Sequence, residues 1–383
     1  MLIPRSLNQI ITGKLKSSNK GVVVYGARQV GKTTLANQII ANLRLKTIVV
    51  NGDQSRYLDI FSSRDLGKIN SFVEGYELLF IDEAQRIPEI GLTLKIILDN
   101  LTHLKVLVTG SSSLDLASKI SEPLTGRIWS YYLYPISFLE LSETNNRAEL
   151  DANLEERLIY GSYPEIFSIA GNTQKQEYLQ NLSDAYLYKD LIMLGGLKNS
   201  LKIRDLLKLL AFQVGFQVSL SEIGSSLGMS KDTISRYIDL LEKSYVLFRL
   251  KGLSRNLRKE VTKMDKIYFC DLGIRNILID NLKPLKDRND SGQLWENFLI
   301  IERMKFLAYT QNYASIYFWR TYTGAELDYV EEKEGRLHGF EFKFGIKRSK
   351  LPLGWNKAYP YSHYSCINRE SYLNFILQNQ RTH

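Results

Sequence analysis

One eight-residue motif near the start of the chain constrains the fold more than any other segment. Residues 26–33 read G-x-x-x-x-G-K-T and lie between an apolar run at residues 21–25 and a helical pattern at residues 34–43. Glycines allow backbone N–H groups to close around an anion, and a helix directs its positive N-terminus at the same charge. The motif and its flanks therefore predict a strand, a phosphate-binding loop (P-loop) and a helix, whereas a chance glycine-rich turn would need no such flanks.

The residues of this loop supply the expected contacts to a nucleotide and its metal ion. The Lys32 ammonium should reach the β and γ phosphates as a catalytic group, and the Thr33 hydroxyl should bind Mg²⁺. ATP and Mg²⁺ are therefore the expected cofactors. The loop residues assigned to nucleotide binding are Gly26, Ala27, Arg28, Gln29, Val30, Gly31, Lys32, Thr33 and Thr34.

A second apolar run ends in two carboxylates. Residues 77–83 read ELLFIDE, and an all-apolar run is typical of a parallel strand that is covered on both faces. Asp82, at its carboxyl end, should bind the Mg²⁺ ion of the nucleotide, and Glu83 is placed to activate the attacking water as the catalytic base. A solvated acidic turn is the alternative, and the presence of the P-loop argues against it.

Two further segments carry weaker signals. An apolar run at residues 105–109 leads into a Gly-Ser-Ser-Ser sequence, in which Ser111 either senses the γ phosphate or forms part of an ordinary turn. Arg127 precedes another apolar run at residues 129–134. It is a candidate arginine finger for the ATP of a neighbouring copy in a homo-oligomer, or else a surface charge.

The order of these motifs resembles that of the AAA-type ATPases of bacteria and archaea, which carry a C-terminal domain of undefined function. The resemblance implies ATP hydrolysis and no settled biological role. It also implies a sheet in which another strand separates the Asp82 strand from the P-loop strand. Besides the P-loop, the segments that carry it are 82–86 (DEAQR), 109–112 (TGSS), 124–127 (LTGR), 134–140 (YPISFLE) and 161–165 (GSYPE).

The charge distribution indicates a nucleic-acid partner. The net charge is +9, and residues 197–270 hold fourteen Lys or Arg against seven Asp or Glu. A basic segment of this kind is typical of DNA binding, although an inert basic surface has the same composition. Only two cysteines occur, no histidines have zinc-ligand spacing, and no apolar run approaches the roughly 20 residues of a membrane span. A cytoplasmic protein without a membrane partner is therefore expected.

A helix-turn-helix pattern lies within the basic segment. Residues 219–227 read as a short helix, and Ser230 is a good N-cap for a helix over residues 231–243. A strand at residues 245–250 and a basic loop at residues 251–266 complete a winged helix, which either binds DNA or docks a protein partner. The DNA-binding candidates are Lys231, Arg236, Arg255, Arg258 and Lys259.

The last part of the chain carries a second candidate site. Three segments between residues 317 and 344 read as strands, on which Asp328 and Glu341 should converge with Glu296 of a preceding helix. Period-two spacing puts Glu341 and Lys343 on one face of their strand. These four residues resemble the PD-(D/E)xK nuclease motif, which implies a metal ion held by three carboxylates with Lys343 beside the water. An exposed hairpin with alternating charges is the alternative.

Together these patterns predict an α/β protein with several parts. They are a three-layer P-loop ATPase domain with a mainly parallel sheet (1–142), a helical segment (143–200), a winged helix (201–270) and a small α/β nuclease-like domain (271–383). The leading hypothesis is a Mg²⁺-dependent ATPase whose nucleotide state controls DNA engagement by the C-terminal region. Two alternatives stay open: an ATP-binding switch that docks a protein partner, and an ATP-gated, metal-dependent DNA nuclease.

Overall fold

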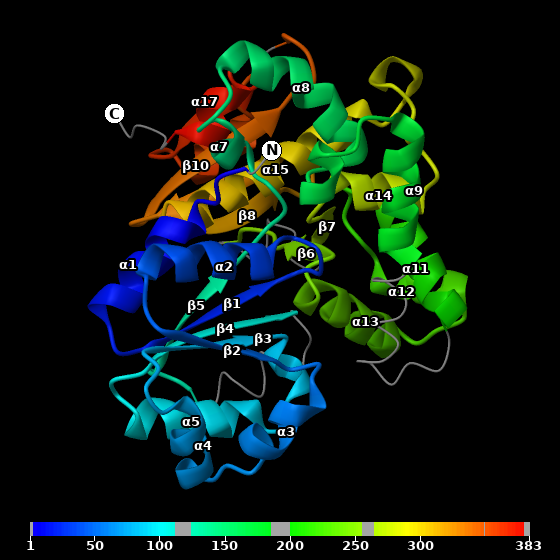
Figure 1. The fold of residues 1–383 in the computed structure, drawn as a ribbon. Helices are drawn as coiled ribbons and strands as arrows, with labels where there is room; N and C mark the ends of the chain where they lie inside the picture. The colour runs from blue at the N-terminus through cyan, green and yellow to red at the C-terminus, as the bar shows by residue number, and fades with distance from the viewer. Residues whose placement is uncertain (1–2, 112–123, 185–199, 255–263, 348, 379–383) are drawn as a thin grey trace.

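The structure, a computed structural model, describes residues 3–111, 124–184, 200–254, 264–347 and 349–378. Within these ranges a five-stranded sheet comes first along the chain, followed by a helical region, a two-stranded sheet and a four-stranded sheet (Figure 1). The α/β class predicted from the sequence is therefore confirmed. None of the helices in this part of the chain is both long enough and apolar enough to cross a membrane.

The first sheet is parallel throughout and has the strand order β2-β3-β4-β1-β5. β4 lies between β1, which leads into the P-loop, and β3, which ends at Asp82. The strand order implied by the family resemblance is therefore confirmed. The strands are β1 (Gly21–Gly26), β2 (Thr47–Asn51), β3 (Leu78–Asp82), β4 (Lys105–Ser111) and β5 (Ile128–Tyr132).

Helices cover both faces of this sheet and give the predicted three layers (Figure 1). Successive strand residues point to opposite faces, so Val22 and Val24 of β1 pack on one side of the sheet and Val23 packs on the other. The apolar runs seen in the sequence are buried strands because both faces are covered. The helices are α1 (Leu7–Ser17) and α2 (Lys32–Leu43) on one face, and α3 (Ser55–Ser62), α4 (Leu66–Val73) and α5 (Ile90–Asn100) on the other.

A helical unit follows the sheet and packs against the C-terminal region. It contains α7 (Phe138–Leu141), α8 (Arg147–Tyr160), η2 (Pro164–Phe167) and α9 (Asn172–Leu182), and α14 (Leu272–Leu278) packs on α8 and α9. Two glycines permit this close packing. A Cβ atom on Gly161 would collide with the Asp271 carboxylate, and one on Gly273 would collide with the Tyr160 carbonyl. Gly161 also has a φ of +73°, which favours glycine.

The helix-turn-helix elements are present where the sequence predicts them. The helix expected over residues 231–243 is confirmed at both ends, and the Ser230 hydroxyl accepts a hydrogen bond from the Thr233 N–H (3.2 Å). Tyr245, just after this helix, stacks on Tyr132 of β5 with ring centroids 3.7 Å apart, so this unit contacts the edge of the first sheet. The elements are α11 (Ser200–Phe212), α12 (Leu220–Leu227), α13 (Lys231–Lys243), and the antiparallel strands β6 (Leu247–Leu250) and β7 (Lys266–Phe269).

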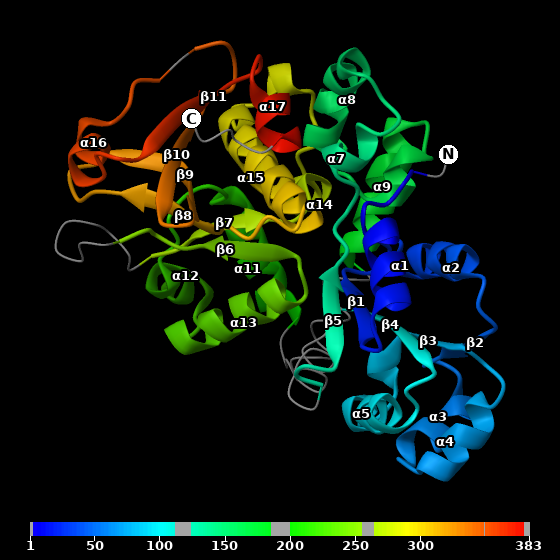
Figure 2. The same ribbon diagram turned by 90° about the vertical axis from the view of Figure 1, so that its left-hand side faces the viewer.

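The four-stranded sheet has the order β11-β10-β9-β8, in which β10 and β11 are parallel and the other neighbours are antiparallel. The 19-residue helix α15 (Ser291–Tyr309) packs beside it, and α11 to α13 lie below it in Figure 2. The three strands predicted in this region are confirmed. The remaining elements are η1 (Ala84–Arg86), η4 (Leu285–Asp287), β8 (Ser315–Arg320), β9 (Glu326–Lys333), β10 (Arg336–Phe342), α16 (Leu353–Ala358), β11 (His363–Ile367) and α17 (Tyr372–Leu377).

Candidate functional site

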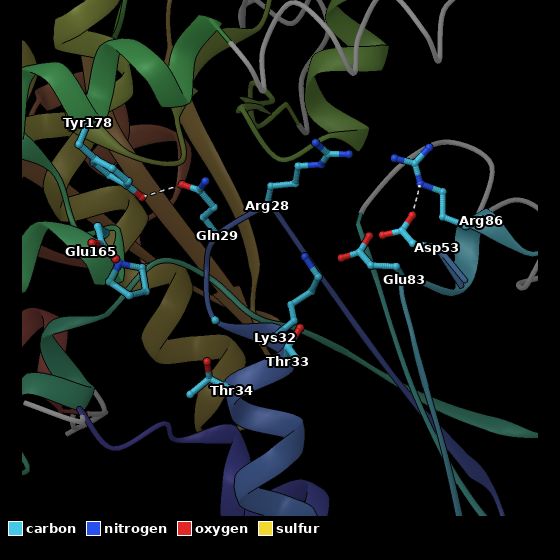
Figure 3. Close-up of a pocket in the computed structure, with 12 residues that line it drawn as sticks. Arg28, Gln29, Lys32, Thr33, Thr34, Asp53, Glu83, Arg86, Glu165 and Tyr178 are labelled. Carbon is cyan, nitrogen blue, oxygen red and sulfur yellow. Dashed lines mark hydrogen bonds and ion pairs between the residues drawn. The ribbon is translucent and has the colours of Figure 1, made fainter. Parts of the chain in front are cut away.

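A cavity of about 950 Å³ lies where the P-loop meets the end of β3 and the helical unit (Figure 3). Ligands of parallel α/β sheets bind at the carboxyl ends of the strands, and the cavity occupies that edge. Its lining combines the P-loop and the start of α2 with residues that follow β2 and β3 and with residues of the helical unit: Arg28, Gln29, Gly31, Lys32, Thr33, Thr34, Asp53, Glu83, Arg86, Pro164, Glu165 and Tyr178.

The carbonyls of the P-loop are held by its own lysine and by Arg5, which precedes α1. Lys32 Nζ donates hydrogen bonds to the carbonyls of Gly26 (3.0 Å) and Ala27 (2.9 Å). From α1's side, buried Arg5 donates to the Val30 carbonyl (2.8 Å) and pairs with Glu140 (2.9 Å). The sequence did not single out Arg5, although Glu140 lies in a motif that carries the family resemblance.

The residues predicted to hold Mg²⁺ are in contact with each other. The Thr33 hydroxyl donates a hydrogen bond to Asp82 Oδ2 (2.9 Å), and the Thr109 hydroxyl of β4 donates to the other oxygen of the same carboxylate. A hydroxyl and a carboxylate are ligands that suit Mg²⁺ when phosphate oxygens and water complete the octahedron. Thr33 and Asp82 therefore fit the ion, and Thr109 orients Asp82.

Glu83 faces the same cavity from the opposite side to Lys32 (Figure 3). Its backbone is in the left-handed region, with a φ of +50°, which turns the chain directly after β3. The Gln85 amide donates a hydrogen bond to the Glu83 carboxylate, and Arg86 pairs with Asp53 (3.2 Å) beside it. A half-buried carboxylate held in this way can orient a water and accept its proton.

The helical unit closes the cavity from the far side. Pro164 and Glu165 of η2 and Tyr178 of α9 all line it. The Tyr178 hydroxyl donates a hydrogen bond to Gln29 Oε1 in the P-loop (3.0 Å), and burial raises the pKa of Tyr178. The family resemblance marked the segment 161–165, but nothing in the sequence pattern indicated Tyr178.

The predicted catalytic residue Arg127 does not line the cavity. Arg127 lies at the amino-terminal edge of the sheet, where its carbonyl accepts a hydrogen bond from the Gly21 N–H (3.0 Å) at the start of β1. Its guanidinium pairs with Asp99 of the same chain (2.6 Å). This edge is opposite the P-loop, so Arg127 does not act on its own chain's nucleotide. Ser111 ends β4, and its side chain is outside the described part of the chain.

An action of Arg127 on a neighbouring copy stays a prediction. It requires that ATP turnover per protein molecule rise with protein concentration, and that Arg127→Ala lose this rise without losing ATP affinity. Asp99→Ala is the matched control, because it frees the guanidinium and should preserve the rise. Turnover that is independent of concentration, together with unchanged activity of Arg127→Ala, would make this residue a surface charge.

Two of the three carboxylates predicted to form a metal site in the C-terminal sheet are each paired with a lysine in this structure. Among the described residues, no three carboxylate, histidine or cysteine side chains are arranged to hold a metal ion. A lysine that the sequence did not indicate takes the central place: buried Lys266 of β7 pairs with Glu296 (3.2 Å) and with Glu326 (2.5 Å). The Tyr268 hydroxyl also donates to Glu296 (2.5 Å). The residues therefore do not fit a divalent cation.

The remaining members of the predicted cluster are near this lysine. Asp328 accepts a hydrogen bond from the Phe342 N–H (2.7 Å), and Lys343 pairs with Glu341 (2.6 Å), as their shared strand face predicts. Burial, followed by the nearby Glu296 and Glu341 carboxylates, raises the pKa of Asp328 well above its ordinary value. The carboxylates thus do approach one another, and their repulsion is offset by Lys266 and Lys343.

Two of the five DNA-binding candidates lie within the described part of the chain, and three lie outside it. Lys231 and Arg236 are exposed on α13, at the end where the helix begins. Arg255, Arg258 and Lys259 lie outside the described residues.

The parallel sheet, the P-loop and the Thr33–Asp82 pair define a P-loop ATPase domain of the AAA type. Residues 18–142 match the AAA domain family. Residues 151–285 match a domain of unknown function (DUF8612), and residues 291–364 match a second one (DUF4143).

Similar proteins extend beyond this domain. The chain is 30% identical over 335 residues to the uncharacterized protein Rv2008c of Mycobacterium tuberculosis, covering 86% of this chain and 71% of that protein. The chain therefore belongs to the same family of AAA-domain proteins. It is 27% identical over 304 residues to the uncharacterized protein MJ1544 of Methanocaldococcus jannaschii, covering 74% and 66%. A solved Walker-type ATPase, paby2304 of Pyrococcus abyssi, aligns with a TM-score of 0.49 at 16% identity, covering 72% and 96%.

Proposed function

We propose that this protein is a cytoplasmic, Mg²⁺-dependent ATPase whose nucleotide state controls how its C-terminal region engages DNA. One observation carries the proposal. The segment 161–165 contributes to the nucleotide cavity at one end and contacts the C-terminal region at the other.

Hydrolysis follows from the groups that surround the cavity. Lys32 exchanges its loop carbonyls for the β and γ phosphates, and the backbone N–H groups of the loop hold the same oxygens. Thr33 and Asp82 would hold Mg²⁺, and the ion would supply positive charge to the phosphates. Glu83 orients the attacking water and accepts its proton. Gln85 positions the Glu83 carboxylate, because it holds one of its oxygens.

The path from the cavity to the C-terminal region is short and buried. Pro164 lines the cavity, and two residues earlier the Ser162 N–H donates a hydrogen bond to the buried Asp271 carboxylate (2.7 Å). Asp271 lies two residues after the end of β7 and caps α14 by accepting a hydrogen bond from the Ile274 N–H (3.2 Å). The Asn276 amide of α14 donates to the Leu158 carbonyl (2.9 Å) in α8. A shift of η2 on nucleotide binding would therefore move β7 and α14 with it.

The surface that we assign to DNA lies on α13, which packs on β6, the strand that pairs with β7. Lys231 and Arg236 project from the first half of the helix, while Ile234 and Ile238 on the other face are buried. Polar and basic side chains early in the second helix are typical of helix-turn-helix contacts to DNA. Because Lys266 occupies the carboxylate cluster, we do not propose metal-dependent cleavage for the C-terminal sheet.

DNA binding is tested by neutralising α13. We expect the double variant Lys231→Ala/Arg236→Ala to weaken binding to duplex DNA. The slope of the logarithm of the binding constant against the logarithm of the salt concentration should fall in magnitude by about two, one for each lost phosphate contact. Lys68→Ala/Lys95→Ala is the control, since it removes the same charge from exposed positions on the first domain. Fluorescence anisotropy over a range of salt concentrations measures both quantities. If the wild type fails to bind DNA at low salt, the protein-docking alternative replaces this proposal.

A further inference from the structure

A second cavity, of about 310 Å³, lies behind η2, on the side away from the nucleotide cavity's P-loop wall. It is enclosed by α7, α8, η2 and α9. Its walls combine apolar side chains, Phe138, Ile166 and Phe167 among them, with polar and charged ones, and the exposed Asn153 is one of the polar residues. None of the nucleotide-binding residues contributes to it, so it is a separate site.

A buried arginine in this cavity lacks partners for two of its three nitrogens. Arg157 is only 3% exposed, and its Nη2 pairs with Glu156 (3.0 Å). Its Nε and Nη1 atoms are buried without any hydrogen-bond partner, while the guanidinium lies over the Phe167 ring at 4.1 Å. Leaving buried donors of a charged group unsatisfied is costly, so this arrangement indicates a missing acceptor.

The charges around the cavity make that acceptor an anion. Lys175 of α9 is 7% exposed and also lines the cavity, and its ammonium pairs with the same Glu156 carboxylate that Arg157 uses. One carboxylate therefore serves two buried cations. Asp271 is near Arg157 but outside the lining, and its oxygens already accept hydrogen bonds from the N–H groups of Ser162 and Ile274.

We propose that this cavity binds a small organic anion whose carboxylate or phosphate group accepts hydrogen bonds from Arg157 and whose apolar part packs against Phe138 and Ile166. The ammonium of Lys175 completes the charge balance. A bare inorganic ion would satisfy the arginine but would leave the apolar walls unfilled, so an anion with a short hydrocarbon portion should bind more tightly than phosphate alone.

The site also communicates with the nucleotide cavity, a role that rests on the proposed ATPase function. η2 is a wall shared by both cavities: Pro164 and Glu165 line the nucleotide cavity, whereas Ile166 and Phe167 line the second cavity. Occupancy of one cavity therefore fixes the four-residue turn that borders the other, and a bound anion should change ATP turnover.

Binding is tested in the Lys32→Ala variant, so that the P-loop does not contribute an anion site of its own. The probes are butyrate, butyl phosphate and inorganic phosphate, titrated by calorimetry and by thermal shift. We expect saturable binding of an organic probe, at least tenfold tighter than that of inorganic phosphate. Adding Arg157→Met or Lys175→Met should weaken it at least tenfold, while Arg147→Met, at an exposed position of the same helix, should leave it unchanged. The two separate cavity variants guard against a folding defect in either one.

Failure to bind any probe, or binding that survives both cavity variants, would overturn the site. Turnover is then measured in the protein with Lys32 intact. A change in turnover that Arg157→Met removes supports the communication between cavities. An absence of ATP turnover with the anion still bound would refute the ATPase proposal and leave the anion site standing.

Discussion

Lys32→Ala is expected to lower the affinity for Mg²⁺-ATP by about 100-fold and to abolish hydrolysis. The ammonium is the cation that the P-loop offers to the β and γ phosphates, and hydrogen bonds to charged groups contribute about 1.5–3 kcal/mol each, or roughly 10- to 150-fold in affinity. Its hydrogen bonds to the Gly26 and Ala27 carbonyls involve backbone atoms, which the variant retains. Calorimetric titration with Mg²⁺-ATP measures the loss.

Lys68→Ala is the control for this experiment, because Lys68 is an exposed lysine of the same domain on α4. It should bind ATP as the wild type does. Equal ATP affinity in the wild type and in Lys32→Ala would refute the assignment of the cavity as a nucleotide site.

Glu83→Gln is expected to separate binding from chemistry. The amide keeps the size of the side chain and its place opposite Lys32, so ATP affinity should stay within a few-fold of that of the wild type. It does not accept the proton of the attacking water, so single-turnover hydrolysis should slow by about 10²- to 10⁴-fold, the range for loss of a general base. Rapid-quench measurement of one turnover gives the rate of the chemical step directly.

Glu89→Gln, a few residues later and exposed, should hydrolyse ATP at the wild-type rate. If Glu83→Gln also turns over ATP within a few-fold of the wild type, the base is another group and the geometry at the end of β3 has a structural role only.

The sequence predicted the parts of this fold that local patterns determine. The P-loop requires its flanking strand and helix within about twenty residues, and the α13 boundaries follow from the Ser230 cap and the periodic burial of Ile234 and Ile238. The position of a strand between β1 and β3 was predicted from the family resemblance alone. Local sequence patterns do not determine which strands are neighbours, because that depends on tertiary packing.

The failures concern contacts between residues far apart in the sequence. Glu296, Asp328 and Glu341 are residue types that commonly bind metal ions. The positive charge near them, however, is the ammonium of Lys266, which comes from another sheet. Ion pairs of this kind depend on which strand lies against which helix. The Arg127–Asp99 ion pair could not be predicted either, because the sequence does not indicate which way an exposed guanidinium points.

The burial of Arg157 in the second cavity could not be predicted from the sequence either. Arg157 lies on a helix with ordinary amphipathic spacing, where an arginine is normally expected to face solvent. Only the packing of η2 and α9 over α8 buries it and deprives two of its nitrogens of water. Its unusual position is therefore a property of the tertiary structure and has no sequence signature.

The measurement that tests the central proposal most directly is the DNA affinity of the Glu83→Gln protein with bound ATP, compared with the same protein with bound ADP. The coupling path through Ser162 and Asp271 predicts that the two affinities differ by at least about fivefold, the lower end of typical allosteric coupling. The variant Lys231→Ala/Arg236→Ala should reduce both. DNA affinities that are equal with ATP, with ADP and without nucleotide would contradict nucleotide control of the C-terminal region.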